Sequence, residues 1–298
     1  MAYEQLRQEL VNSLVAREFL QSPAIIKAMS EVPRHLFVTT SPQTAYADEA
    51  VSIKQENNRV ISTISQPSIV AYMLEHLTLS EGCKVMEIGT GLGYNAALLS
   101  RLVGTKGRVF SIEYDRELAA RASQNLKLYE NVSVINDDGR RGWLAQAPYD
   151  RIIATVTASD IYPAWMEQLA PGGLILMPLE YFPGFTRLLK LKRTKAGLSG
   201  KFGLAVNFVS MAGEADRESP EVDTISAFLL KEHMSYRDAE SFLFFSLCCR
   251  QSLETALDSW RRLGRPGPED FLVRAEPHRL RLVLADTELG LSLKHTIK

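Results

Sequence analysis

The chain has 298 residues, of which 46% are hydrophobic and 23% are charged, and its formal net charge is -1. This fits one large globular domain, alone or with a smaller one, and the balanced charge gives no general attraction to nucleic acid or to a membrane surface. We therefore expect neither as a partner. The three cysteines and five histidines are too scattered for a disulfide framework or a zinc site, so no metal is expected.

The start of the chain is polar and amphipathic, which is not typical of a signal peptide. The longest uncharged run, residues 60–74, contains a proline and is shorter than the roughly 20 residues that cross a bilayer. We therefore expect a cytoplasmic protein.

The N-terminal quarter of the chain predicts three helices. Leucines and valines recur at helical spacing in the first helix, and the serine–proline pair at 22–23 begins a second one, which ends at Pro33. Residues 34–59 are turn-rich, and we expect them to be irregular. A third helix begins near Ser65 or Gln66 and continues through an apolar segment.

From residue 84 onward, short apolar runs alternate with helical patterns. Strands and helices of these lengths, in this order, are typical of βαβ units, and they predict an α/β fold with a mostly parallel sheet covered on both faces. The expected strands are residues 84–88, 107–114, 132–137, 149–156 and 174–179, then 186–194 and 204–212, and the expected helices are 94–104, 116–130 and 163–173.

The last quarter of the chain predicts a small α+β extension. A charged, proline-containing segment at 213–223 reads as a linker, followed by a helical stretch at 236–263 and two strand-like runs joined at Asp286. This extension could be a separate unit or an extra layer on the main domain. We expect an N-terminal helical and substrate-lid segment at 1–78, a Rossmann-like core at 79–213, and an extension of unknown role at 214–298.

A glycine turn follows the first of these strands, in the sequence VMEIGTGLGYNAALL (residues 85–99). Its glycines allow a tight turn and close approach to a ligand, and the helix start adds N–H groups. A dinucleotide site would show GxGxxG, but the spacing here is GxGxG. Glu87, just before the turn, would repel a pyrophosphate and attract an ammonium group. This favours S-adenosylmethionine over NAD.

Acidic residues also end the next two strands. Glu113 can accept both hydrogen bonds of a ribose diol, Asp138 can meet an adenine amino group, and Gly139 allows close approach. Each signal alone also fits a solvated strand end or a turn. The carboxyl ends of parallel strands meet at one edge of a sheet, so together they predict an S-adenosylmethionine site there.

Several segments resemble the protein-L-isoaspartate O-methyltransferase family in order and spacing over residues 1–212. They include VPRHLFV, AYADEAVSI, STISQPSIVAYML, the glycine turn and NDDGRRGW, and the combination of TISQP with the glycine turn is the most specific. The resemblance implies a class I S-adenosylmethionine-dependent methyltransferase fold. It also implies a protein-L-isoaspartate(D-aspartate) O-methyltransferase-type enzyme, which methylates the side-chain carboxylate of isoaspartyl residues in damaged proteins.

The same resemblance implies roles for individual residues. Ser65 would be the catalytic residue, and residues 64–68 would fold over the cofactor. S-adenosyl-L-methionine would be the donor and S-adenosyl-L-homocysteine the product. The partner would be a peptide or protein with an isoaspartyl or aspartyl carboxylate, and the oligomeric state stays open. The expected cofactor contacts are Ile64, Gln66, Ser68, Glu87, Gly89, Thr90, Gly91, Asn95, Glu113, Tyr114, Asp138 and Gly139.

The hydroxyl-rich segment at 62–70 contains no charged or histidine side chain that could act as a base. A carboxylate acceptor, with a reference pKa of about 4, is already deprotonated at neutral pH and needs none. The Ser65 hydroxyl would donate to one acceptor oxygen and aim the other at the methyl group. Without the family pattern, a plain helix N-cap would be the favoured interpretation of Ser65.

Three functions remain open from the sequence. The first is repair of many isoaspartyl proteins. The second is a dedicated methyltransferase for one ribosomally made, modified peptide, suggested by the extension and by the loops at 155–162 and 180–186. The third is an adaptor that binds S-adenosylmethionine without catalysis. The intact glycine turn, Glu113 and Ser65 argue against the third.

Overall fold

A computed structural model describes residues 2–182, 184–212, 235–249, 253–276, 279–284 and 287–292. The expected linker at 213–223 lies outside these ranges. Within them, no helix combines the length and the apolar character needed to cross a membrane.

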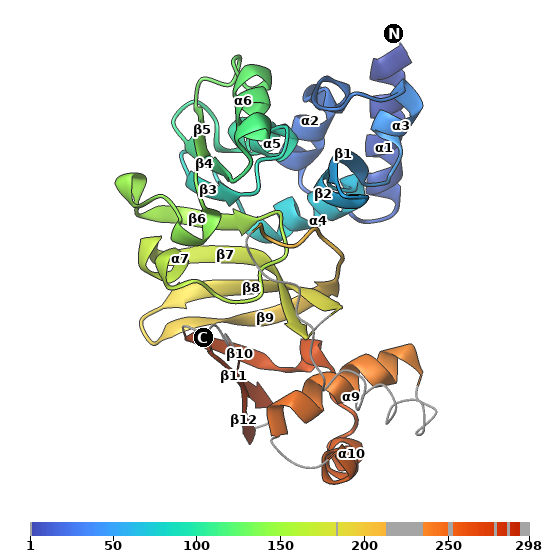
Figure 1. Cartoon of the computed structure of the whole chain (residues 1–298), viewed down its shortest axis with the longest axis vertical. Helices are drawn as coiled ribbons and strands as arrows, with labels where there is room; N and C mark the ends of the chain where they lie inside the picture. The colour runs from blue at the N-terminus through green and yellow to red at the C-terminus, as the bar shows by residue number, and fades with distance from the viewer. Residues whose placement is uncertain are drawn as a thin grey trace.

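Short helices form the N-terminal end of the molecule (Figure 1). They share one hydrophobic core with the helices that cover the nearby face of the sheet, and Leu10, Val11 and Leu14 of the first helix are buried in it. The elements are α1 (Ala2–Ala16), α2 (Pro23–Glu31), η1 (Arg34–Phe37), α3 (Pro42–Tyr46) and α4 (Pro67–Leu77).

The start of α2 differs from the expectation in one detail. Ser22 occupies the N-cap position, but its side chain does not cap the helix. Instead Glu75 of α4 accepts hydrogen bonds from the backbone N–H groups of Gln21 and Ser22, at 2.8 and 2.7 Å, and from the Ser22 hydroxyl at 2.6 Å. A carboxylate from another helix therefore satisfies the exposed start of α2.

Residues 34–59 were expected to be irregular, and this was wrong for the second half. There the structure forms an antiparallel hairpin of β1 (Val51–Glu56) and β2 (Arg59–Ile64). Asn57 and Asn58 form its turn with φ values of 47° and 62°. Asparagine tolerates this left-handed conformation, which two-residue hairpin turns require.

The central sheet contains five neighbouring parallel strands, as expected from the sequence. Val85, Val109 and Ile153 face one core, whereas the adjacent Met86 and Phe110 belong to the core on the opposite face. Apolar side chains are therefore buried on both faces. The strands are β3 (Lys84–Ile88), β4 (Arg108–Glu113), β5 (Val132–Asn136), β6 (Tyr149–Ala154) and β7 (Leu169–Phe182), and the helices between them are α5 (Tyr94–Val103), α6 (Arg116–Asn125) and α7 (Pro163–Gln168).

Two antiparallel strands, β8 (Phe185–Thr194) and β9 (Gly197–Ala205), continue the sheet. The strand expected at 204–212 was misplaced, because β9 begins opposite the end of β8, with Thr194 paired to Gly197. Glycines in GLSGKFGLA weaken the strand pattern. Residues 206–212 instead leave the sheet and return to Thr157, which bridges Ser210.

The C-terminal extension adds three strands to the same sheet, giving the order β12-β11-β10-β9-β8-β7-β6-β3-β4-β5. Figure 1 shows this sheet running through the molecule from the N-terminal helices to the extension. The helical stretch expected at 236–263 is two helices, not one. The elements are α9 (Tyr236–Cys249), α10 (Leu253–Arg262), β10 (Leu272–Glu276), β11 (Arg279–Leu284) and β12 (Thr287–Ser292).

The extension also shares a hydrophobic core with the main sheet. Phe244 of α9 packs edge-on against Tyr181 of β7 and Phe202 of β9, with ring centroids 5.1 and 5.3 Å apart. The extension therefore forms an extra layer over part of the sheet. The domain boundaries near residues 78 and 213 stay predictions.

Candidate functional site

The glycine turn after β3 forms the floor of the candidate site. Gly89, Gly91 and Gly93 have φ values of 93°, 56° and 97°, which side chains other than glycine rarely adopt. A Cβ atom on Gly89 would lie 2.8 Å from Oγ1 of Thr155. The turn is therefore packed too closely against Thr155 for a larger residue at position 89.

Glu113 ties this turn to the end of β4. One carboxylate oxygen accepts the N–H of Gly91 at 2.8 Å and the other accepts the N–H of Asp115 at 3.0 Å. Burial raises the pKa of Glu113, although these hydrogen bonds oppose the rise. A carboxylate has about four lone-pair sites, so Glu113 can still accept a hydrogen bond from a diol.

Glu87 lies beneath the turn and lines none of the cavities described below. Its side chain is fully buried and accepts hydrogen bonds from Asn95 Nδ2 at 2.7 Å and from Ser111 Oγ at 2.5 Å. Burial raises the pKa of Glu87 to about 7, against the effect of these two hydrogen bonds. The carboxylate therefore orients Asn95 from below.

Two adjoining cavities lie above the turn, and both are lined by Thr63, Gly89, Gly91 and Thr155. One extends towards the start of α4, and the other extends along the ends of β4 and β5. Together they bring most of the expected residues to one place. The expected residues that line them are Ile64, Ser65, Gly89, Thr90, Gly91, Asn95, Glu113, Tyr114 and Gly139.

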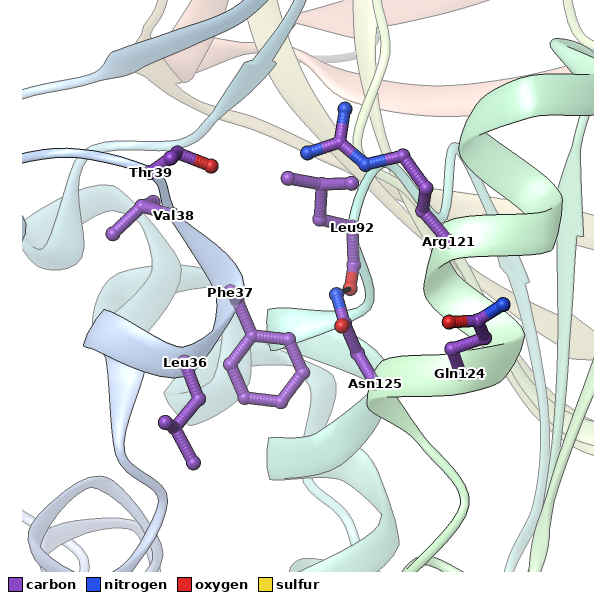
Figure 2. A pocket seen from close by; sticks show the side chains of 8 residues that line it. All are labelled: Leu36, Phe37, Val38, Thr39, Leu92, Arg121, Gln124 and Asn125. Atoms are coloured by element: carbon purple, nitrogen blue, oxygen red, sulfur yellow. Dashed lines mark hydrogen bonds between the residues drawn. The ribbon is translucent and has the colours of Figure 1, made fainter.

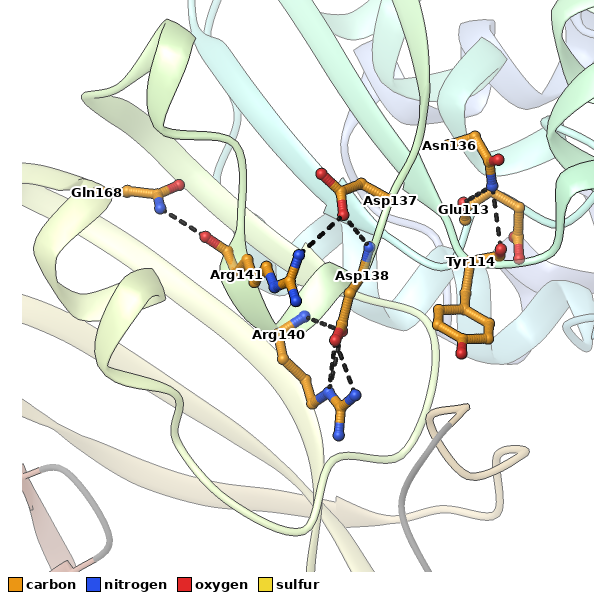
Figure 3. Close-up of polar contacts among 8 residues, drawn as sticks. All are labelled: Glu113, Tyr114, Asn136, Asp137, Asp138, Arg140, Arg141 and Gln168. Carbon is orange, nitrogen blue, oxygen red and sulfur yellow. Dashed lines mark hydrogen bonds and ion pairs between the residues drawn. The ribbon is translucent and has the colours of Figure 1, made fainter.

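Gln66, Ser68, Glu87 and Asp138 do not line either cavity. The Asp138 carboxylate is held by Arg140, whose Nη2 lies 2.7 Å from Oδ2, and these hydrogen bonds lower the pKa of Asp138 (Figure 3). Its neighbour Gly139 lines the cavity instead, and a Cβ there would lie 2.4 Å from Cγ2 of Ile88.

Ser65 stands immediately before α4, and the structure does not use it as the cap. The N-cap position belongs to Gln66, which makes no side-chain cap hydrogen bond. The N–H of Ser68 in the first turn is accepted by Asp48 Oδ1 at 2.8 Å. Ser65 lines the cavity beside Asn95.

Among the lining residues that were not named as expected cofactor contacts are three groups. Residues 61–63 lie on β2, and Thr155 and Val156 follow β6 at the same sheet edge as the acidic residues. The strand-end rule that selected Glu113 would also have found Thr155. Residues 209–212 reach the site through hydrogen bonds between the backbones of Thr157 and both Val209 and Met211, at 2.8 and 2.9 Å. No local sequence signal marks them.

A further cavity of about 200 Å³ lies between η1 and α6 (Figure 2). Asn125 of α6 donates a hydrogen bond to the carbonyl of Leu92 at 2.9 Å, which closes one side. None of the expected site residues lines this cavity. We therefore do not take it as the candidate site, in spite of its volume. Its lining residues are Leu36, Phe37, Val38, Thr39, Leu92, Arg121, Gln124 and Asn125.

The family model for protein-L-isoaspartate(D-aspartate) O-methyltransferase matches residues 4–216. The chain belongs to this family. It is 40% identical to the protein-L-isoaspartate O-methyltransferase of Ignicoccus hospitalis over 71% of this chain and 99% of that protein. It is also 40% identical to protein-L-isoaspartate O-methyltransferase 2 of Archaeoglobus fulgidus over 75% of this chain and all of that protein. The resemblance inferred from the sequence is thereby confirmed.

Solved structures confirm the class I methyltransferase fold. A protein-L-isoaspartate O-methyltransferase matches with a TM-score of 0.65 and 27% identity over 96% of this chain and 87% of its own. That match therefore extends past residue 216 into the extension. A Plasmodium falciparum structure, described as a putative member in complex with S-adenosyl-L-homocysteine, has a TM-score of 0.62 at 21% identity and covers 70% of this chain and 99% of its own.

Proposed function

We propose that the protein is an S-adenosylmethionine-dependent O-methyltransferase that acts on the side-chain carboxylate of L-isoaspartyl residues, and that it repairs damaged proteins in the cytoplasm. The family membership supports the reaction. The observation that carries the proposal is the position of Ser65, which lines the same cavity as the glycine turn and is not needed as a helix cap.

The residues above the turn suit S-adenosylmethionine. Gly91, Gly139 and Glu113 line one cavity, and the Glu113 carboxylate can accept a hydrogen bond from the hydroxyls of a ribose. Asn95, oriented by Glu87, would face the amino acid end of the cofactor. When bound, the cofactor supplies an electrophilic methyl group on a positively charged sulfur. We assign no contact to the Asp138 carboxylate, because Arg140 already holds it.

The protein's own task is placement of the acceptor. A carboxylate is ionised at neutral pH, so no base is required, and a hydroxyl donor that aims it is sufficient. Ser65 would donate to one acceptor oxygen, an interaction worth about 1.5–3 kcal/mol with a charged group. The apolar neighbours Ile64 and Val70 would exclude water from the reacting atoms.

The proposal is tested by offering radiolabelled methyl donor with an isoaspartyl peptide and with its aspartyl twin. We expect label on the isoaspartyl peptide only. Label on neither peptide would contradict a general repair function and leave a dedicated peptide substrate or a binding protein. Label on both would contradict the proposed selectivity for the isoaspartyl linkage.

A further inference from the structure

The first turn of α4 takes its cap from a residue far upstream. A helix begins with N–H groups that lack helical partners, and Pro67 has no N–H, so Ser68 presents the first of them. Asp48 Oδ1 accepts it at 2.8 Å. The side chain of Gln66 also bonds to the Asp48 carboxylate. Asp48 therefore holds the residue next to Ser65 and the residue three positions beyond it.

The Asp48 carboxylate is in turn fixed from the N-terminal side. Arg17, at the end of α1, places Nη1 2.7 Å from Asp48 Oδ2. Burial would raise the pKa of Asp48, but the hydrogen bonds from Ser68, Arg17 and Gln66 lower it, so the carboxylate is ionised at neutral pH. A negative charge at a helix start is also favourable to the helix dipole.

The loop that carries Asp48 has its own internal support. The fully buried Arg34 donates from Nε to the carbonyl of Ala45 at 3.0 Å and from Nη2 to the carbonyl of Glu49 at 3.4 Å. Its guanidinium lies 5.0 Å from the ring centroid of Tyr94, which lines the cavity with Ser65. The loop is thereby held on both sides of Asp48.

We propose that Asp48 is a positioning residue for Ser65: its carboxylate anchors Gln66 and Ser68 and so sets the direction of the Ser65 hydroxyl without touching the substrate. This inference rests on the role proposed for Ser65 above. A misplacement of about 1 Å in a positioning group is enough to lower a rate about a hundredfold. The effect should appear in turnover, because the hydrogen bonds described for Asp48 go to Arg17 and to the start of α4, and not to the glycine turn or Glu113, which would bind the cofactor.

The test is Asp48→Asn, which keeps the shape of the side chain. An amide has one acceptor oxygen where the carboxylate has two, so it cannot serve Arg17 and the start of α4 together. We expect kcat with an isoaspartyl peptide to fall at least tenfold. The KM for S-adenosylmethionine and the Kd for S-adenosylhomocysteine should change less than threefold.

Glu75→Gln is the matched control. Glu75 also holds the start of a helix from a distance, through the N–H groups of Gln21 and Ser22, but that helix is α2, whereas Asp48 holds the start of α4 next to Ser65. We expect both variants to lower the melting temperature and only Asp48→Asn to lower kcat. Equal loss of kcat in the two variants, or loss of cofactor affinity in step with kcat, would show that Asp48 is merely structural.

Hydrogen exchange separates this inference from the proposed function. The amide of Ser68 should exchange faster in Asp48→Asn than in wild type, whichever peptide is the substrate. Unchanged exchange overturns the anchoring itself, whereas a wild-type enzyme that is inactive on isoaspartyl peptide overturns the proposed function.

If Asp48→Asn does not fold, Arg17→Met removes the same ion pair from its exposed side, and it should lower kcat severalfold at unchanged cofactor affinity. Wild-type kcat in that variant would count against the inference.

Discussion

Ser65 is available for chemistry because Asp48 supplies the cap of the helix that follows it. We predict that Ser65→Ala lowers turnover roughly tenfold to hundredfold, the effect of losing a hydrogen bond to a charged acceptor in the transition state. Initial rates with an isoaspartyl peptide measure this. S-adenosylhomocysteine affinity should stay near the wild-type value. Ser30→Ala, which removes a hydroxyl bonded only within α2, is the control and should leave turnover unchanged.

Because the Glu87 side chain is buried and its pKa is raised, we predict that the free energy of unfolding depends on pH. Its pKa is raised from 4.5 to about 7 in the folded protein, so between these values the folded state holds a proton that the unfolded state has lost. Stability must therefore fall as pH rises through this window, by roughly 3 kcal/mol in the cofactor-free protein.

Glu87→Gln, which imitates the protonated acid, should remove this fall. The measurement is the free energy of unfolding by urea at pH 5 and at pH 8 in both proteins. Wild type and variant should be alike at the lower pH, and the variant should be more stable at the higher pH. Parallel changes in the two proteins would assign the pH dependence to other groups.

The sequence placed Gly89 and Glu113 correctly at one edge, because residues that end neighbouring parallel strands must meet there. It could not foresee that Asn95 and Ser111 would enclose Glu87, since that depends on how α5 and β4 pack. Asp138 was engaged by Arg140, only two residues away. From the sequence alone, Arg140 is only one of several groups that could pair with the Asp138 carboxylate.

At the scale of elements, the β1–β2 hairpin is a part of the site that the sequence did not predict. Its second strand contributes residues 61–63 to the cavity that Glu113 also lines. Alternating side chains around an asparagine pair were a usable hairpin signal. Part of the hairpin's contact with the Rossmann-like core, in contrast, is made by the ion pairs of Lys54 with Asp115 and Glu117, and no local pattern reveals that pairing.

The ion pairs of Lys54 should help to hold the hairpin against the start of α6. Its Nζ lies 2.5 Å from Asp115 and 3.5 Å from Glu117, both at the start of α6. We predict that Lys54→Met speeds dissociation of S-adenosylhomocysteine severalfold, because the hairpin opens more easily. Stopped-flow dissociation rates measure this, and wild type in high salt should approach the variant, since ion pairs at a surface are screened. Equal rates at low salt would show that the ion pair does not restrain the hairpin.

At the scale of the whole molecule, the sequence predicted the parallel strands well, because each is a local apolar run between helices. It left open whether the extension is a separate unit or a layer on the main domain. That choice depends on the pairing of β10 with β9, in which Val273 lies opposite Gly200. Pairing between segments so distant in the sequence is set by tertiary packing, which a local pattern does not encode.

The interface between the extension and the main sheet predicts how the whole chain unfolds. Arg187 of β8 places Nε 2.7 Å from the Glu240 carboxylate of α9, and both side chains are largely buried. Glu240→Ala leaves that guanidinium buried with the half-exposed Glu269 and the Gly203 carbonyl as partners, and it should cost about 3–5 kcal/mol. Asp238→Asn removes a charge from the exposed pair that the same helix makes with Arg265, and it should cost less than about 1 kcal/mol.

Calorimetry of the full chain distinguishes a shared core from two independent ones. Because Phe244 packs against both β7 and β9, the extension cannot separate from the sheet without exposing part of the common core. We therefore expect a single cooperative transition in wild type, shifted to lower temperature as a whole by Glu240→Ala. If Glu240→Ala instead showed an additional transition at lower temperature, with the main transition still at the wild-type temperature, the sheet would be stable without its extension.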